Sequence, residues 1–100
     1  MKTKHYTVDR TNRERIIKEI GEGTIMATFT VDKGHPNGPE LHSITTNGII
    51  IIRNKRTHKL ITKLIARPAQ IKRYFKRITP RVKEIMALAE QHKEMGLYMM

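Results

Sequence analysis

Five side chains in the central part of the sequence have the types that metal-free cleavage of RNA requires. Glu40 and His42 stand two residues apart, so a β-strand would place both on one face. The reaction needs a group that takes the 2′-OH proton, a group that protonates the leaving oxygen, and cations that hold the phosphorane. His42 titrates near working pH and is the best candidate for the acid or base. Arg67 has a planar fork that matches phosphate oxygens, and Thr62 and Tyr74 complete the predicted catalytic set.

Each of these residues also has an ordinary structural interpretation. Glu40 and His42 can form a polar pair on a wet face of a strand, and Thr62 can simply be a β-branched sheet residue. Tyr74 can be a core aromatic whose hydroxyl reaches the surface. Arg67 can bond carbonyl groups near the start of a helix. The sequence leaves both interpretations open.

The charge of the chain points to a polyanionic partner. Twenty Lys and Arg against nine Asp and Glu give a formal net charge of +11 at pH 7. Residues 41–83 hold twelve Lys and Arg and no acidic side chain. A charge of this size in a small domain favours nucleic acid as the partner, and we expect RNA ahead of DNA. A merely basic solvated surface, an acidic protein and a membrane surface are the alternatives.

The predicted nucleic-acid surface comes from residues 53–83. Its cations lie in an expected turn, on the strand that follows, and on a helix-like run that carries no acid. These candidate binding residues are Arg53, Lys55, Arg56, Lys63, Lys72, Arg73, Lys76 and Arg77.

Several other classes of function find no support in the sequence. The chain has no cysteine, which removes disulfides, thiolate zinc sites and cysteine nucleophiles. The five histidines are too widely spaced for the usual metal motifs, so no metal site is predicted; they are His5, His35, His42, His58 and His92. The segments "GEG" and "GHPNG" match neither phosphate-binding fingerprint, so we expect no cofactor. No apolar run is long enough to span a membrane and the N-terminus resembles no signal peptide, which predicts a cytoplasmic protein.

The N-terminal part of the chain predicts one helix and one strand. Thr11 and Glu14 have the spacing of a capping box, and Gly21 suits the left-handed residue that ends a helix. Ile16, Ile17 and Ile20 would share one face of that helix. Residues 24–31 alternate as a half-buried strand does, and its two predicted faces are Ile25, Ala27, Phe29 and Val31 against Thr24, Met26, Thr28 and Thr30. A loop over residues 32–39 follows.

The central part predicts three further strands. Asn47-Gly48 lies between two β-prone runs and is a strong hairpin signal. The run "GIIIIRN" does not alternate, so we expect this strand to be central or covered on both faces. The run "HKLITKLIA" predicts a fourth strand, with Leu60, Thr62 and Leu64 on one face and Ile61, Lys63 and Ile65 on the other.

The C-terminal part predicts two helical segments. Pro68 suits the first position of a helix, and apolar residues continue at helical spacing to Ile78, which indicates a helix over residues 68–78. Thr79 and Pro80 then start a last helix with an apolar stripe of Val82, Ile85, Met86, Ala89 and Met95. The whole pattern predicts a single α+β domain over residues 1–100, with an N-terminal helix, a four-stranded antiparallel meander and C-terminal helices.

This order of elements resembles the small basic ribonuclease-toxin superfamily that groups barnase, EndoU, the tRNA-cleaving colicins and the RelE-type toxins. The segment "GPELHSITTNGIIIIRNKRTHKLITKLIARPAQIKRYF", residues 38–75, also resembles proteins of Gram-positive bacteria and their phages. The resemblance implies a metal-independent endoribonuclease whose His42, Thr62, Arg67 and Tyr74 match the positions of the family's catalytic side chains. A protein partner such as an antitoxin belongs to the same expectation. The rival hypothesis is a phage or mobile-element protein that binds a bacterial protein or duplex DNA and catalyses nothing.

Overall fold

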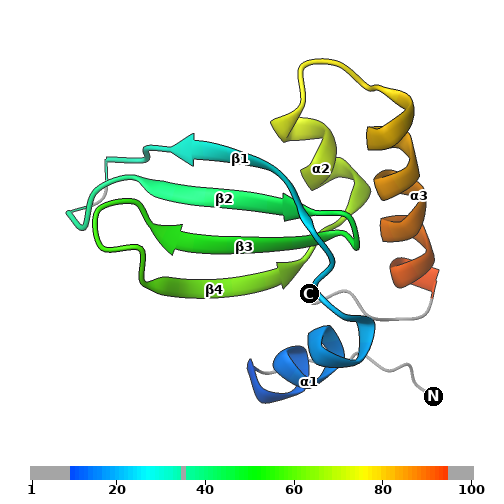
Figure 1. Ribbon diagram of the computed structural model, residues 1–100, viewed down its shortest axis with the longest axis horizontal. Coiled ribbons are helices and arrows are strands. Elements are labelled where there is room, and N and C mark those ends of the chain that lie inside the picture. The colour runs from blue at the N-terminus through cyan, green and yellow to red at the C-terminus, as the bar shows by residue number, and fades with distance from the viewer. Residues whose placement is uncertain (1–9, 35, 95–100) are drawn as a thin grey trace.

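The computed structural model describes residues 10–34 and 36–94, with side-chain environments for residues 13–34 and 36–92. The expected α+β order is confirmed (Figure 1). The elements are α1 (Arg10–Ile20), β1 (Ile25–Val31), β2 (Glu40–Thr45), β3 (Ile49–Asn54), β4 (Leu60–Ile65), α2 (Pro68–Tyr74) and α3 (Pro80–Glu94).

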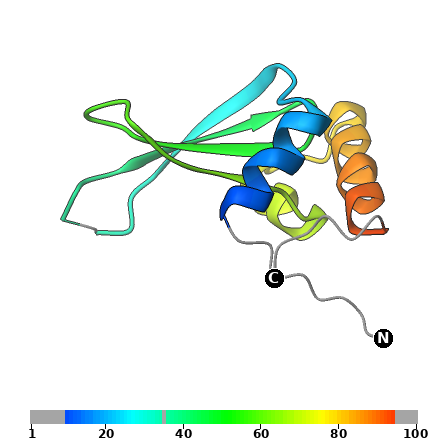
Figure 2. The same ribbon diagram turned by 90° about the horizontal axis from the view of Figure 1, so that it is seen from below.

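The four strands form one antiparallel sheet in the order β1-β2-β3-β4, so β2 and β3 are central and β1 and β4 are its edges. The helices gather at one end of the sheet, and the β1–β2 loop and the β3–β4 turn extend away from them (Figures 1 and 2). The site must therefore be sought both at the helical end and along the uncovered part of the strands.

The isoleucine run of β3 is the centre of the core, as its lack of alternation predicts. Ile50 and Ile52 pack with residues of α2 and α3 on one face, whereas Ile49 and Ile51 pack with Ile17 of α1 on the other. All four side chains of the run are buried. Burying a side chain of this size contributes about 1.5–3 kcal/mol. The strand therefore joins two helical layers through a single sheet.

The β2–β3 hairpin uses a three-residue connection. Gly48 adopts a φ of +77° and donates its N–H to the carbonyl oxygen of Thr45 at 3.0 Å, whereas Asn47 does not have a positive φ. This geometry is a tight turn followed by a left-handed glycine rather than a two-residue loop with both residues left-handed. The Asn47 side chain instead donates from Nδ2 to the Gly21 carbonyl oxygen at 2.9 Å. The turn thereby holds the end of α1, which the sequence did not indicate.

The expected alternation is wrong in parts of both edge strands. In β1 the register shifts between Ile25 and Ala27, so Met26 packs against the core and Ile25 is exposed, the reverse of the prediction. In β4 the register shifts where Leu60 pairs with Arg53. A bulge inserts one extra residue and moves the following side chains to the other face. Leu60 accordingly leaves the face of Thr62, and Ile61 is 42% exposed rather than buried with Ile65.

The helix predicted over residues 68–78 ends at Tyr74. Phe75 has extended backbone angles, φ −103° and ψ 127°, and Ile78 is 37% exposed instead of joining the core. A longer helix would place Lys72 beside Lys76, and like charges four residues apart destabilise a helix. Pro80 also disfavours helical angles at the residue before it. The last cations of the run therefore lie on an irregular connection.

The two longer helices begin and end largely as predicted. The N–H of Gly21 bonds to the carbonyl oxygen of Ile17 at 2.8 Å, with a φ of +84° at Gly21. The helix starts at Arg10, and the predicted cap at Thr11 falls outside the described side chains. Thr79 caps α3, since its Oγ1 accepts the N–H of Val82 at 3.2 Å. Val82, Ile85 and Ala89 are buried and Met86 packs against them, whereas Met95 lies outside the described residues.

Candidate functional site

Three of the five predicted catalytic residues meet at the junction of β2 with the end of α2. The Nδ1 atom of His42 lies 2.7 Å from the Tyr74 hydroxyl oxygen, and its Nε2 atom lies 3.0 Å from Oε1 of Glu40. Glu40 and His42 share a face because they are two residues apart in a strand. The three side chains therefore form one continuous hydrogen-bonded chain.

The chain is consistent with one proton arrangement. Burial raises the pKa of Tyr74, the nearby Glu40 carboxylate raises it further, and the positive charge of Arg73 opposes both effects. Tyr74 therefore stays protonated at neutral pH and donates to Nδ1 of His42. The Nε2–H of the ring then donates to the Glu40 carboxylate. This tautomer satisfies every polar atom of the imidazole.

The same geometry limits what His42 can do. The residue is only 5% exposed, and both ring nitrogens already have partners. A general base must come within hydrogen-bond reach of the proton that it takes. In this arrangement the imidazole can relay a proton between Glu40 and Tyr74, but it offers no free nitrogen to a 2′-OH. Glu40 and Tyr74 are both partly exposed and form the two ends of the chain.

Aromatic rings support this junction from the side of β1. The Phe29 ring lies 5.4 Å from the Tyr74 ring and 5.3 Å from the Phe75 ring, centre to centre, and the second pair is edge-to-face. Phe29 also pairs with His42 in the β1–β2 register. Contacts of this geometry add to the stabilisation that burial provides. The rings thus hold the end of α2 against two strands.

Thr62 and Arg67 lie apart from this junction. Thr62 pairs with Ile52, which pairs with His42, so the two polar residues face the same way with one strand between them. Two strand spacings separate them by about 10 Å. Arg67 precedes α2 whereas Tyr74 ends it, a rise of roughly 10 Å along the helix. The five predicted residues therefore do not line one site, and Arg67 does not reach the position of a phosphate clamp for His42.

Several of the predicted binding cations have structural partners. The Arg53 guanidinium donates to the carbonyl oxygen of His58 at 3.2 Å, and the Arg56 guanidinium lies directly over Gly38. Lys63 forms an ion pair with Glu22 of the α1–β1 connection. The stretch without acids in the sequence is therefore not free of acids in space. Lys55 is exposed at the tip of the β3–β4 turn.

The remaining predicted cations form what we call the basic cluster. All four side chains are exposed, and none forms an ion pair with a described carboxylate. They lie on the last turn of α2 and on the connection to α3, at the far end of the molecule from the β3–β4 turn (Figure 1). The basic cluster consists of Lys72, Arg73, Lys76 and Arg77.

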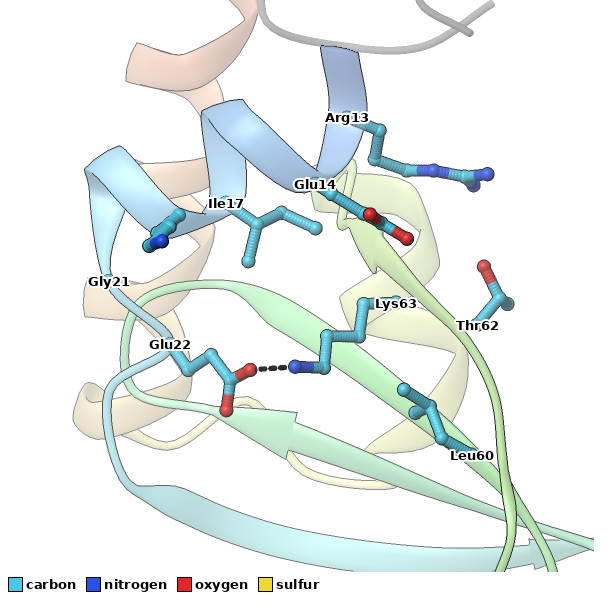
Figure 3. Close-up of a pocket in the computed structure, with 9 residues that line it drawn as sticks. Arg13, Glu14, Ile17, Gly21, Glu22, Leu60, Thr62 and Lys63 are labelled. Atoms are coloured by element: carbon cyan, nitrogen blue, oxygen red, sulfur yellow. Dashed lines mark hydrogen bonds and ion pairs between the residues drawn. The ribbon is translucent and has the colours of Figure 1, made fainter. Parts of the chain in front are cut away.

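A hollow of about 410 Å³ lies elsewhere, between α1 and the edge strand β4 (Figure 3). Its floor is apolar and its rim carries charges of both signs, including the ion pair between Glu22 and Lys63. Its lining residues are Arg13, Glu14, Ile17, Lys18, Gly21, Glu22, Leu60, Thr62 and Lys63. The hollow contains neither His42 nor Tyr74, and sequence reasoning missed it because the α1 residues are brought to β4 only by the tertiary fold.

No protein-family model, curated protein or solved structure matches the chain. Within residues 10–34 and 36–94, no group of three or more His, Asp or Glu side chains is arranged to hold a metal ion. Over the same residues, none of the helices has the length and hydropathy that crossing a membrane requires. The functional argument therefore rests on the geometry of the basic cluster and of the Glu40, His42 and Tyr74 chain.

Proposed function

We propose that the protein binds nucleic acid through the basic cluster. The observation that carries the proposal is that four exposed cations lie within six consecutive residues, none of them paired with a described carboxylate. Each unpaired cation can contact a phosphate and release the counterions that surround it. RNA is proposed ahead of DNA because the element order resembles ribonuclease toxins.

The distribution of carboxylates supports this choice of surface. Glu22 neutralises Lys63 beside α1, and Glu40 is engaged by His42. The basic cluster has no such neighbour among the ion pairs of the described residues, so its positive potential adds to the net charge of the chain instead of being cancelled locally. A polyanion would therefore be drawn to the end of α2 rather than to the α1 side of the sheet.

The test uses three double variants that each remove one Lys and one Arg. Lys72→Gln with Arg73→Gln, and Lys76→Gln with Arg77→Gln, alter the basic cluster. Arg15→Gln with Lys18→Gln alters exposed cations of α1 and is the matched control. Affinity for a single-stranded RNA oligomer is measured between low and moderate salt. Each cluster variant should lose up to two contacts of about 0.7 in the log–log salt slope.

The control separates a contact surface from a general effect of charge. If the three variants lower the slope equally, net charge and not the basic cluster determines binding, and the proposed surface is wrong. If the wild-type protein shows no salt-sensitive binding to RNA or DNA, the proposed function is wrong altogether. Thermal unfolding of each variant checks that the fold is intact.

Cleavage of RNA is a second candidate, favoured by the hydrogen-bonded chain of Glu40, His42 and Tyr74. The accessible ends of that chain would exchange protons with the 2′-OH and the leaving oxygen, and Arg73 is the cation whose charge acts on Tyr74. The bond from the 2′-oxygen to phosphorus forms as the bond to the 5′-oxygen breaks, so the products end in 2′,3′-cyclic phosphate. EDTA should not inhibit this reaction.

The cleavage candidate is tested with His42→Ala and Tyr74→Phe. Each should lower the rate by about 10²-fold or more, the usual scale for loss of an acid–base group. Arg67→Ala is the comparison, because Arg67 lies at the other end of α2 and should leave the rate nearly unchanged. RNA that stays intact at high protein concentration, or cleavage that survives both changes, would leave a binding protein without this activity.

A further inference from the structure

Three of the five aromatic residues of the chain gather beside the basic cluster. We call Phe29, Tyr74 and Phe75 the aromatic cluster; the other two, Tyr6 and Tyr98, lie outside the described residues. Tyr74 and Phe75 stand directly between the two halves of the basic cluster in the sequence Lys72-Arg73-Tyr74-Phe75-Lys76-Arg77. Rings and cations therefore share one short stretch of backbone.

The aromatic cluster is fixed from below and open from above. All three rings pack against the core formed by β3, α2 and α3, yet each remains partly exposed. Phe29 contacts both other rings, and Tyr74 is held in addition by its hydrogen bond to His42. A ring that is immobilised before binding loses little conformational entropy when a ligand covers it.

The end of α2 at Tyr74 is what places the rings among the charges. Because Phe75 is extended, the chain leaves the helix there and carries the next two cations onto the α2–α3 connection. The electrostatic effect of Arg73 on the Tyr74 hydroxyl shows that this guanidinium is close enough to act on the cluster. Cations thus precede and follow the rings along the path of a bound backbone.

We infer that the nucleic acid bound at this site is single-stranded and that its bases stack on the aromatic cluster. The inference rests on the proposed function and specifies its ligand. Proteins that bind single strands combine a cationic track for phosphates with aromatic side chains for bases, and stacking requires base faces that a duplex keeps covered. Phe75 is the central stacking residue, because Phe29 and Tyr74 also support the junction with His42.

A fluorescence experiment tests the stacking directly. The chain has no Trp, so Phe75→Trp introduces a single indole at the proposed site. The probe is an oligouridylate of about eight nucleotides, within the range of site sizes for such proteins. A base-free ribose phosphate oligomer of the same length and charge is the comparison ligand. Oligouridylate should quench the indole, whereas the base-free oligomer should bind without quenching it.

Thr30→Trp is the matched control variant. Thr30 is exposed and follows Phe29 in β1, so strand alternation places it on the opposite face of the sheet. Its indole should respond to neither oligomer. Equal quenching in both variants, or quenching of Phe75→Trp by the base-free oligomer, would overturn the inference.

A second variant measures what the ring contributes to affinity. Phe75→Leu keeps an apolar side chain against the core but removes the aromatic face. Affinity for oligouridylate should fall about fivefold or more, while affinity for the base-free oligomer and the salt slope stay unchanged. The Lys76→Gln with Arg77→Gln variant should instead lower the slope for both oligomers. If the leucine variant proves unfolded, the quenching of Phe75→Trp decides the question.

The results separate the inference from the proposed function. Salt-sensitive binding that is equal for the two oligomers, or tighter for a duplex of the same sequence, leaves the basic cluster as a phosphate surface and removes the stacking. Absence of binding to every oligomer and duplex removes both.

Discussion

The hydroxyl oxygen of Tyr74 lies 2.7 Å from Nδ1 of His42, so one hydrogen bond joins the last residue of α2 to the middle of β2. These residues are far apart in the sequence, and the bond closes a contact that the connecting strands alone would not make. The basic cluster begins two residues before Tyr74 and continues after it. The position of the cluster relative to the sheet therefore depends on this bond and on the ring contacts of Phe29.

Replacing Tyr74 by Phe should lower the free energy of unfolding by about 1–3 kcal/mol. The change leaves Nδ1 of His42 buried without a partner, and that penalty usually exceeds the net gain from a hydrogen bond. His42→Leu should also destabilise the protein. The double variant should lose less than the sum of the two single losses, because both remove the same bond. Denaturant midpoints measure all three, and a simple sum would show that the bond contributes nothing of its own.

Removing either side of the isoleucine core should be costly. Ile50 is 1% exposed and packs towards α2 and α3, whereas Ile51 is 5% exposed and packs towards α1. Ile50→Ala and Ile51→Ala should each lower the free energy of unfolding by about 2–5 kcal/mol through lost burial and the cavity left behind. Ile61→Ala, at an exposed position, is the control and should cost far less. Midpoints that hardly move for the two core variants would contradict this placement.

Two glycines with similar backbone angles separate backbone strain from steric overlap. Gly23 and Gly34 both have positive φ, +81° and +72°. A Cβ at Gly23 would lie 2.7 Å from Oγ1 of Thr46 and 3.0 Å from the backbone nitrogen of Asn47, whereas a Cβ at Gly34 would meet nothing within 4 Å. Gly34→Ala should cost roughly 1–2 kcal/mol for the left-handed backbone alone. Gly23→Ala should cost clearly more, as thermal unfolding of the two variants would show.

The stability of the protein should fall in mild acid because of His92. The residue is 4% exposed in α3, its Nδ1 has no hydrogen-bond partner among the described residues, and burial lowers its pKa. Below a pH of about 6.5 the unfolded chain binds a proton that the folded chain refuses, so the free energy of unfolding decreases as the pH falls. Above that pH the contribution of His92 is fully present.

The slope that one such group contributes is at most about 1.4 kcal/mol for each pH unit. Urea unfolding of the wild-type protein and of His92→Leu between pH 7 and pH 5 measures it, and the variant should show the smaller slope. His58→Asn is the control, because His58 is exposed and its positive φ of 62° is tolerated by Asn. An unchanged slope in His92→Leu would assign the acid sensitivity to other groups.

Local patterns predicted the elements because each pattern has a direct physical cause. The unbroken run Ile49–Ile52 required cover on two faces, and β3 has it. Asn47-Gly48 and Thr79-Pro80 marked a hairpin and a helix start, and both are present. The bulges near Ile25 and Ile61 could not be seen in the same way, because an extra residue changes the pairing without changing the composition of the strand.

The candidate site was only partly predictable. The spacing of Glu40 and His42 places them on one strand face whatever the rest of the chain does. That Tyr74 joins them depends on where α2 ends and how it packs across β1 and β2, which is a tertiary property. Arg67 was grouped with them because it is close to Tyr74 in sequence, yet the helix between them separates the two side chains. The partner of Lys63, Glu22, lies outside the stretch whose charge was considered.

The order of the strands has a consequence for how quickly the protein acquires its structure. Every strand pairs with its neighbour along the chain, and the strands are joined only by residues 32–39, 46–48 and 55–59. Closing a short loop costs less entropy than closing a long one, and folding rates rise as contacts become more local. The β2–β3 hairpin can therefore form first and serve as the template on which β1 and β4 add, each by a local step. Such a chain spends little time with unpaired strand edges exposed during its synthesis.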